Sequence, residues 1–261
     1  MIRTVTATRY IHPLREGGSV PAVVEADDGE LYVMKFIGAA QGPKALIAEL
    51  VAGEIARTVG LRLPEIVLIE LDPVLGRSEP HPEIRDLIQA SGGLNLALRY
   101  LPSAFAYNPL LQPPVNAELA SAIVWFDAYV TNVDRTPRNV NMLLWQEELW
   151  LIDHGAALYF HHDWSDYLAR SRSPFAFIRQ HVLLPLASQV GAADERLRPL
   201  LTEERLRQIV DWIPAHWLGD EAQFAGPDEH RTAYLAYLTT RLAAAPETFV
   251  REAANAHAAL V

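Results

Sequence analysis

The chain has 261 residues, of which 50% are hydrophobic and 21% charged, a composition typical of a globular protein with a sizeable core. Its formal net charge of −10 argues against non-specific binding to nucleic acid or to an anionic membrane surface. The chain has no cysteine, no signal sequence and no apolar stretch of about 20 residues. These features exclude disulfides and thiolate sites, and they indicate a cytoplasmic protein.

The first hundred residues predict strands arranged around one helix. A turn signal at 27–30 separates two apolar runs, as expected for a β-hairpin. Pro43 suits the first helical position and Gly60 the position after a last turn. The expected elements are strands at 21–25, 31–37, 63–71 and 94–101, a helix at 43–59 and a connector at 72–93 with room for one short helix.

The second part of the chain reads as mainly helical. Two short apolar runs at 140–145 and 149–153 predict a tight hairpin. Strands in the first part and helices in the second favour an α+β fold with segregated lobes, at 1–101 and 102–261. The expected helices cover 117–130, 173–190, 202–212 and 228–256.

The hairpin gathers oxygen-bearing side chains at one end. With Glu147 at the centre of its turn, Asn141 would face Asp153. Asn139, Asn141 and Asp153 would then share one face of the ribbon. An amide oxygen of Asn139 and a carboxylate of Asp153 are normal ligands of Mg²⁺. Asp134, five residues before Asn139, could reach a hydroxyl proton beside that metal.

The order of these residues is that of a kinase catalytic loop followed by a metal-binding Asp-x-Gly turn. Lys35 lies in the strand at 31–37, and it is one of only two lysines in the chain. Two glutamates on the next helix could pair with it. On a helical wheel Glu54 falls inside the apolar arc and Glu49 outside it, so the wheel alone favours Glu54 as the buried carboxylate. The segment 17–19, Gly-Gly-Ser, could offer backbone N–H groups to phosphate.

Four stretches of sequence carry a family resemblance. The helix and Gly-Leu-x-x-Pro at 49–65, the loop Asn-x-Asp at 132–134 with Asn139, the run at 150–155 and the segment at 209–218 resemble those of HipA-type kinases. The resemblance implies a two-lobed protein-kinase-like fold, with an antiparallel sheet and one helix in the N-lobe and a mainly helical C-lobe. It also implies that ATP and Mg²⁺ bind between the lobes.

The resemblance assigns a role to each site residue. It selects Glu49, not Glu54, as the partner of Lys35. The implied roles are phosphate contacts for Lys35, Gly17, Gly18 and Ser19, catalytic base for Asp134, metal ligands for Asn139 and Asp153, contact with the transferred phosphate for Arg138, and an adenine-binding hinge for Arg99, Tyr100 and Leu101.

The sequence departs from the family pattern at three places and leaves the acceptor open. Thr136 stands where HipA-type enzymes have a histidine, and the longer glycine loop of eukaryotic kinases is missing. The longer toxin kinases also have an additional N-terminal subdomain, for which this sequence of 261 residues is expected to be too short. Relatives of the persistence toxins phosphorylate protein serine or threonine, which is the expected activity here. The alternatives are a pseudokinase or nucleotide-gated binding module, a small-molecule or lipid kinase, a nucleotidyl transferase, and a structural α+β domain.

Overall fold

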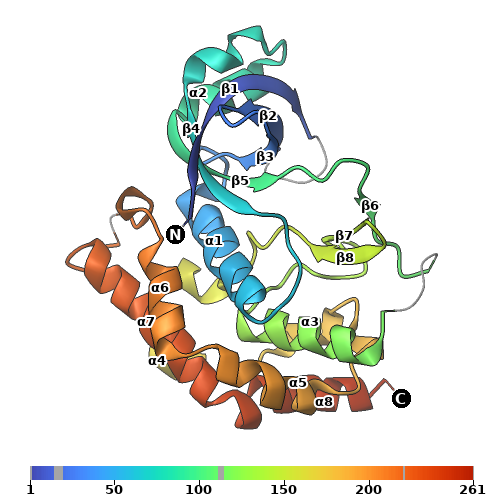
Figure 1. Cartoon of the computed structure of the whole chain (residues 1–261). Helices are drawn as coiled ribbons and strands as arrows, with labels where there is room; N and C mark the ends of the chain where they lie inside the picture. The colour runs from blue at the N-terminus through green and yellow to red at the C-terminus, as the bar shows by residue number, and fades with distance from the viewer. Residues whose placement is uncertain (1, 15–19, 111–114, 220, 261) are drawn as a thin grey trace.

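The computed structural model describes residues 2–14, 20–110, 115–219 and 221–260. Five strands in its upper part close into a barrel with the order β1-β2-β3-β5-β4 (Figure 1). Strands β1 and β4 run parallel, and the other neighbours run antiparallel. The strands are β1 (Thr4–Pro13), β2 (Ala22–Ala26), β3 (Leu31–Lys35), β4 (Ile66–Leu71) and β5 (Gly93–Arg99).

The barrel corrects the expected antiparallel sheet with one helix. Strand β1 was not expected, because Val5 and Ala7 are its only buried residues and exposed threonines alternate with them. Its parallel pairing with β4 is what closes the sheet. The expected connector at 72–93 contains a 3₁₀ helix, η1 (Pro73–Ser78), and a second α-helix, α2 (Pro82–Ala90). The apolar stripe of α2 is narrow, since only Ile84 and Ile88 are buried.

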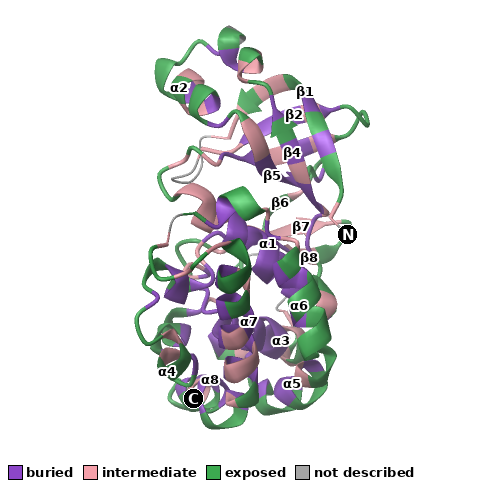
Figure 2. Cartoon of the chain, turned by 90° about the vertical axis from the view of Figure 1, so that its left-hand side faces the viewer, coloured by how far each residue is buried: buried purple, intermediate pink, exposed green. Residues whose placement is uncertain are grey.

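Helix α1 (Gly42–Thr58) lies between the barrel and the lower helices (Figures 1 and 2). Every residue from Leu46 to Ala56 is buried. Its apolar side chains join one core with the helices that follow, whereas the barrel interior forms a separate core. A helix buried on all sides has no amphipathic pattern, so a helical wheel could not select the partner of Lys35.

The lower part of the molecule begins with helix α3 (Ala117–Tyr129), which the side chain of Asn116 caps by accepting a hydrogen bond from the Leu119 N–H at 2.8 Å. The helices after it are α4 (Tyr167–Ser171), α5 (Val190–Leu197), α6 (Glu203–Asp211), α7 (Pro227–Ala243) and α8 (Phe249–Ala258), with 3₁₀ turns η2 (Tyr159–His162), η3 (Ala176–Gln180), η4 (Leu184–Leu186), η5 (Arg198–Leu200), η6 (Ala215–Trp217) and η7 (Ala245–Glu247). In Figure 1, α5 and α8 lie below α3, and α4, α6 and α7 lie to its left.

Two expected helices are wrong in extent. The span 173–190 holds the separate turns η3 and η4, and α5 begins only at Val190. Pro185 lies in the second of these turns and cannot donate a helical hydrogen bond. The span 228–256 is divided into α7 and α8 by a break at 244–248 that contains Pro246.

The expected hairpin exists, but its register differs by one residue. It consists of β7 (Met142–Trp145) and β8 (Glu148–Leu151), joined by a two-residue turn in which Gln146 and Glu147 both have positive φ. A short strand, β6 (Phe105–Ala106), pairs with β7. Between β7 and β8, Leu143 lies opposite Trp150, whereas the predicted register placed it opposite Leu151. Because side chains alternate along a strand, the argument that Asn141 and Asp153 share a face does not hold.

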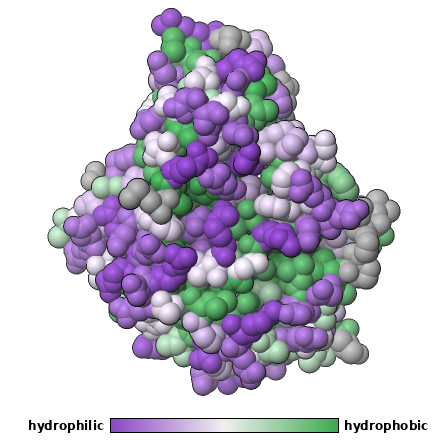
Figure 3. Space-filling model, viewed as in Figure 1, coloured by the Kyte–Doolittle hydropathy of each residue, from purple (hydrophilic) through white to green (hydrophobic). Residues whose placement is uncertain are grey.

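Hydrophilic residues cover most of the face shown in Figure 3, with hydrophobic ones gathered below its middle. In the described ranges, no helix is both long and apolar enough to cross a bilayer. The division of the chain after Leu101 stays a prediction, and the core of α1 is continuous with that of the lower helices.

Candidate active site

Lys35, the last residue of β3, contacts two carboxylates that are distant in the sequence. Its Nζ lies 2.5 Å from Oε2 of Glu49 and 2.6 Å from Oδ1 of Asp153. The other candidate, Glu54, accepts a hydrogen bond from Nε of Arg57 at 3.2 Å. The structure thus places Glu49, the residue that the resemblance selected, opposite Lys35.

The Lys35–Glu49 pair is buried and charged. Burial by itself raises the pKa of Glu49, but the Lys35 ammonium and the hydrogen bond from His154 outweigh it and lower that pKa to about 2. For Lys35, burial lowers the pKa, and the charges of Glu49 and Asp153 outweigh burial and raise it. Both groups are therefore ionised at neutral pH. A fixed ammonium at this position is suited to binding a phosphate.

His154 belongs to this site, although the sequence analysis did not single it out. Its backbone N–H donates to Oε2 of Glu49 at 2.8 Å, and its ring Nδ1 lies 3.3 Å from Oε1 of the same carboxylate. The ring is fully buried and meets Phe126 edge to face. The position of a histidine between Asp153 and Gly155 was a signal that could have identified it. His154 joins the turn that carries Asp153 to helix α1.

The loop at 130–141, between α3 and β7, brings Asp134 next to two asparagines. Nδ2 of Asn139 donates to Oδ2 of Asp134 at 2.6 Å, and Nδ2 of Asn141 donates to the same oxygen at 3.3 Å. Thr136 and Asn139 exchange two backbone hydrogen bonds, at 3.0 and 3.1 Å. This tight turn returns Asn139 to Asp134, which explains the five-residue spacing of the two.

The environment of Asp134 makes its carboxylate a better proton acceptor than a free one. Burial raises the pKa of Asp134, and the negative charge of Asp153 raises it further. The hydrogen bonds from Asn141 and Asn139 and the charge of Arg135 act in the opposite direction, and the pKa remains above its ordinary value. A raised pKa favours service as a general base near neutral pH.

Asp153 and Asn139 each keep an oxygen free of hydrogen bonds among the described residues. Asp153 has positive φ, lies beyond the last pair of the hairpin, and uses only Oδ1 for Lys35. Asn139 uses its amide nitrogen for Asp134, which leaves its carbonyl oxygen. One carboxylate and one amide oxygen fit a hard divalent cation that takes its other ligands from water and phosphate. Within the described ranges, no three His, Cys, Asp or Glu side chains lie close enough together to hold a metal by themselves.

The expected hinge follows strand β5. The backbone N–H of Arg99 donates to the carbonyl of Glu65, and that of Tyr100 to the carbonyl of Leu31, both at 2.8 Å. In the described part of the chain the backbone N–H of Leu101 has no such partner, and Leu101 is buried. The side chain of Arg99 pairs with Glu30 at 2.8 Å.

The remaining expected site residues stand apart from these contacts. Arg138 is exposed in the turn between Thr136 and Asn139, and its side chain makes no hydrogen bond or ion pair with any described residue. Gly17, Gly18 and Ser19 lie outside the described residues. A role for each of them stays a prediction.

A buried ion pair below the loop was also missed. Nε of Arg135 lies 2.6 Å from Oδ2 of Asp127, and both side chains are fully buried. The signal was present, because Asp127 is an acidic residue inside an otherwise apolar stretch of the helix expected at 117–130. A charge in such a place needs a partner.

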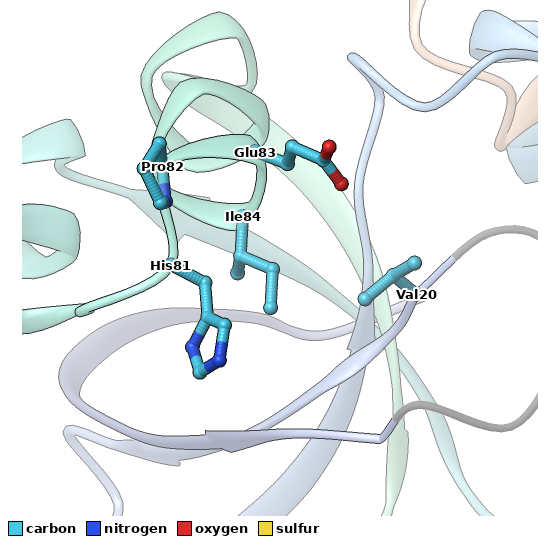
Figure 4. Close-up of a pocket in the computed structure, with 5 residues that line it drawn as sticks. All are labelled: Val20, His81, Pro82, Glu83 and Ile84. Atoms are coloured by element: carbon cyan, nitrogen blue, oxygen red, sulfur yellow. The ribbon is translucent and has the colours of Figure 1, made fainter.

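A cavity of about 500 Å³ lies elsewhere in the upper part of the molecule. Figure 4 shows His81, Pro82, Glu83 and Ile84 around it, at and before the start of α2, with Val20 opposite. None of the candidate site residues that the structure describes lines it. Lys35, Asp134 and Asp153 therefore lie outside this cavity.

Comparison with known proteins gives one family and a shared fold. A family model described as HipA-like kinase matches residues 8–248. The Helicobacter pylori proinflammatory kinase CtkA is similar, with a TM-score of 0.53 and 14% identity over 98% of this chain and 99% of that chain. The Golgi casein kinase gives 0.53 and 13% over 94% and 74%, and its structure with Mn and ADP bound gives 0.54 and 12% over 95% and 76%. No curated protein sequence matches significantly. At these identities the solved structures show the kinase-like fold.

Proposed function

The chain belongs to the HipA-like kinase family, and from this premise we propose that it transfers the γ-phosphoryl group of ATP, in the presence of Mg²⁺, to a protein serine or threonine hydroxyl. The observation that supports this most is the position of Lys35 between Glu49 and Asp153. Lys35 and Asp153 are 118 positions apart, yet their charged atoms lie 2.6 Å from each other. This contact joins the strand that would bind phosphate to the turn that would bind metal.

We assign nucleotide binding to the two ends of this site. Lys35 is held by Glu49 so that its ammonium can contact the α- and β-phosphates. At the hinge, the N–H groups of Arg99 and Tyr100 are already used within the described structure, and that of Leu101 is the donor left for adenine. Leu101 is buried, so a hydrogen bond there would be shielded from water.

Asp134 is the proposed catalytic base. Its Oδ2 is held by the amides of Asn139 and Asn141, whereas Oδ1 accepts no hydrogen bond from a described residue. Oδ1 would accept the proton of the acceptor hydroxyl while that oxygen bonds to the γ-phosphorus and the bond to the β–γ bridging oxygen breaks.

The metal ligands are the free oxygens of Asn139 and Asp153. When bound, Mg²⁺ supplies positive charge that offsets the charge of the phosphates. Lys35 would then share Asp153 with the metal. The protein acceptor is supported by the fold, since the Golgi casein kinase, whose name indicates a protein substrate, shares it.

The direct test follows label from ATP. The protein is incubated with Mg²⁺ and ATP labelled at the γ- or the α-phosphate, alone and with dephosphorylated casein. We expect label from the γ-position only, and Asp134→Asn should lower the rate by orders of magnitude with ATP affinity within several-fold. Asp72→Asn, a matched control at the start of η1 whose side chain accepts the N–H of Val74 and no other hydrogen bond from a described residue, should remain active.

The other outcomes assign the other functions. Label from the α-position would show nucleotidyl transfer. Binding of ATP without any transfer would show a nucleotide-gated module. The absence of any thermal shift with Mg²⁺ and ATP would indicate a structural domain.

A further inference from the structure

Asp127 is the centre of a buried network beneath the candidate active site. Its Oδ2 accepts hydrogen bonds from Nε of Arg135 at 2.6 Å and from Nε2 of His181 at 2.8 Å. Its Oδ1 accepts one from Nδ2 of Asn132 at 2.8 Å. Burial by itself raises the pKa of Asp127, but the charge of Arg135 and the bond from His181 outweigh burial and hold that pKa well below its ordinary value. The carboxylate is thus a fixed charge that three different side chains bind.

Arg135 extends this network to both halves of the site. It follows Asp134 directly in the sequence, and it is almost completely buried. Its Nη1 donates to the backbone carbonyl of Asn141. The side-chain amide of Asn141 in turn donates to Asp134. The same nitrogen lies 3.5 Å from the carbonyl of Ile152, the residue before Asp153. One guanidinium therefore spans from the loop that carries Asp134 to the turn that carries Asp153.

His181 adds the segment between α4 and α5. Its Nδ1 accepts the backbone N–H of Leu183 at 3.0 Å, so the ring proton is on Nε2 and points to Asp127. The backbone N–H of Val182 donates to the carbonyl of Arg135 at 3.1 Å. The adjacent residues His181 and Val182 thus bind helix α3 and the loop, respectively.

We propose that Asp127 and His181 are positioning residues for phosphoryl transfer, an inference that rests on the proposed function. Together they hold Arg135, and through it they set the distance between the base Asp134 and the metal ligand Asp153. An ion pair that only stabilises the fold needs no particular position in the core. The hydrogen bonds of Arg135, by contrast, reach the residues next to the carboxylates of Asp134 and Asp153, which must act together. A displacement of about 1 Å between reacting groups can reduce a rate by about 100-fold.

The test compares two substitutions of His181. In His181→Gln the amide nitrogen can occupy the place of Nε2 and donate to Asp127, whereas His181→Leu has no donor. We expect His181→Leu to lower kcat by about 10- to 100-fold with KM for ATP within about 3-fold, and His181→Gln to retain most of kcat. Asp127→Asn should resemble His181→Leu wherever it folds.

A control variant separates positioning from stability. Asp194→Ala removes a buried carboxylate that accepts the indole N–H of Trp125 at 2.8 Å. Trp125 lies on the same helix as Asp127, so the variant disturbs that helix without touching the network. It should lower the melting temperature without lowering kcat. The inference is overturned if His181→Leu lowers kcat no more than Asp194→Ala does, or if folded His181→Gln is as slow as His181→Leu. A wild-type protein without transfer activity would overturn the proposed function and this inference with it.

Discussion

Replacement of Lys35 by methionine tests whether the charge at the centre of the site is as buried as the structure indicates. Lys35→Met keeps most of the side-chain volume but removes the ammonium between Glu49 and Asp153. Glu49 is then left as a fully buried carboxylate, and its remaining donors among the described residues are the backbone N–H and the ring of His154. The variant should lose phosphoryl transfer and also a measurable part of its stability.

The magnitude follows from the burial of each partner. Loss of one member of a buried ion pair costs about 3–5 kcal/mol in unfolding free energy. The pair with Asp153, whose side chain is 44% exposed, adds less than about 1 kcal/mol. Adding Glu49→Gln to Lys35→Met removes the uncompensated charge and should leave a net loss below about 2 kcal/mol. The double variant should therefore be more stable than Lys35→Met alone, and still inactive.

Urea unfolding followed by the fluorescence of the six tryptophans measures these differences. Thermal unfolding should agree, with a loss of roughly 6–20 °C for Lys35→Met. If Lys35→Met is as stable as the wild type, or if Glu49→Gln lowers its stability further, the reasoning from burial is refuted. Transfer activity in either variant would contradict the role of the lysine.

Three further predictions concern the metal, the packing of α1 and pH. Asp153→Ala should abolish the Mg²⁺-dependent part of ATP affinity, and calorimetry that finds an unchanged affinity for Mg²⁺ and ATP would contradict the metal role. Gly53→Ala should lower the unfolding free energy by about 1–3 kcal/mol, because the added Cβ would lie 2.4 Å from Cδ1 of Ile66. Gly191→Ala is the control: its added Cβ would meet no other side chain within 4 Å, so the variant should be as stable as the wild type or more stable. The pKa of Glu49 falls from 4.5 to about 2 on folding, so its contribution to stability is present above pH 4.5 and is lost as the pH falls toward 2. Acid titration of Glu49→Gln should therefore show a smaller loss of stability over that range than the wild type, and equal losses would exclude the assigned ionisation.

The family was accessible from the sequence because its motifs are local. Asp134 and Asn139 lie in one short loop, and the spacing that made them recognisable is explained by a four-residue turn. The family expected from these motifs is confirmed by a match over residues 8–248. Strand β3 and helix α1 were also expected, since the turn signal at 27–30, Pro43 and Gly60 determine the backbone conformation of the few residues beside them.

The hairpin shows how a local signal can fail by one residue. The apolar runs predicted two strands, but their register depended on whether the turn has two or three residues. Gln146 and Glu147 both adopt positive φ, which makes the turn a two-residue one. Nothing in the identity of these two residues demands that conformation. The position of Asp153 is instead set by the bend after β8, where its own φ is positive.

By itself, the sequence determined several local elements, among them β3, α1 and α3, and the motif proposed to carry the chemistry, because turn residues, caps and periodicity act over short distances. Only the tertiary structure decided what each buried charge binds. Asp127 meets His181 across 54 positions, and Glu49 meets His154 across 105. A buried charge requires a partner, and the sequence can show that a charge will be buried among apolar residues. It does not show which residue will be the partner, because the partner depends on how whole elements pack around one core.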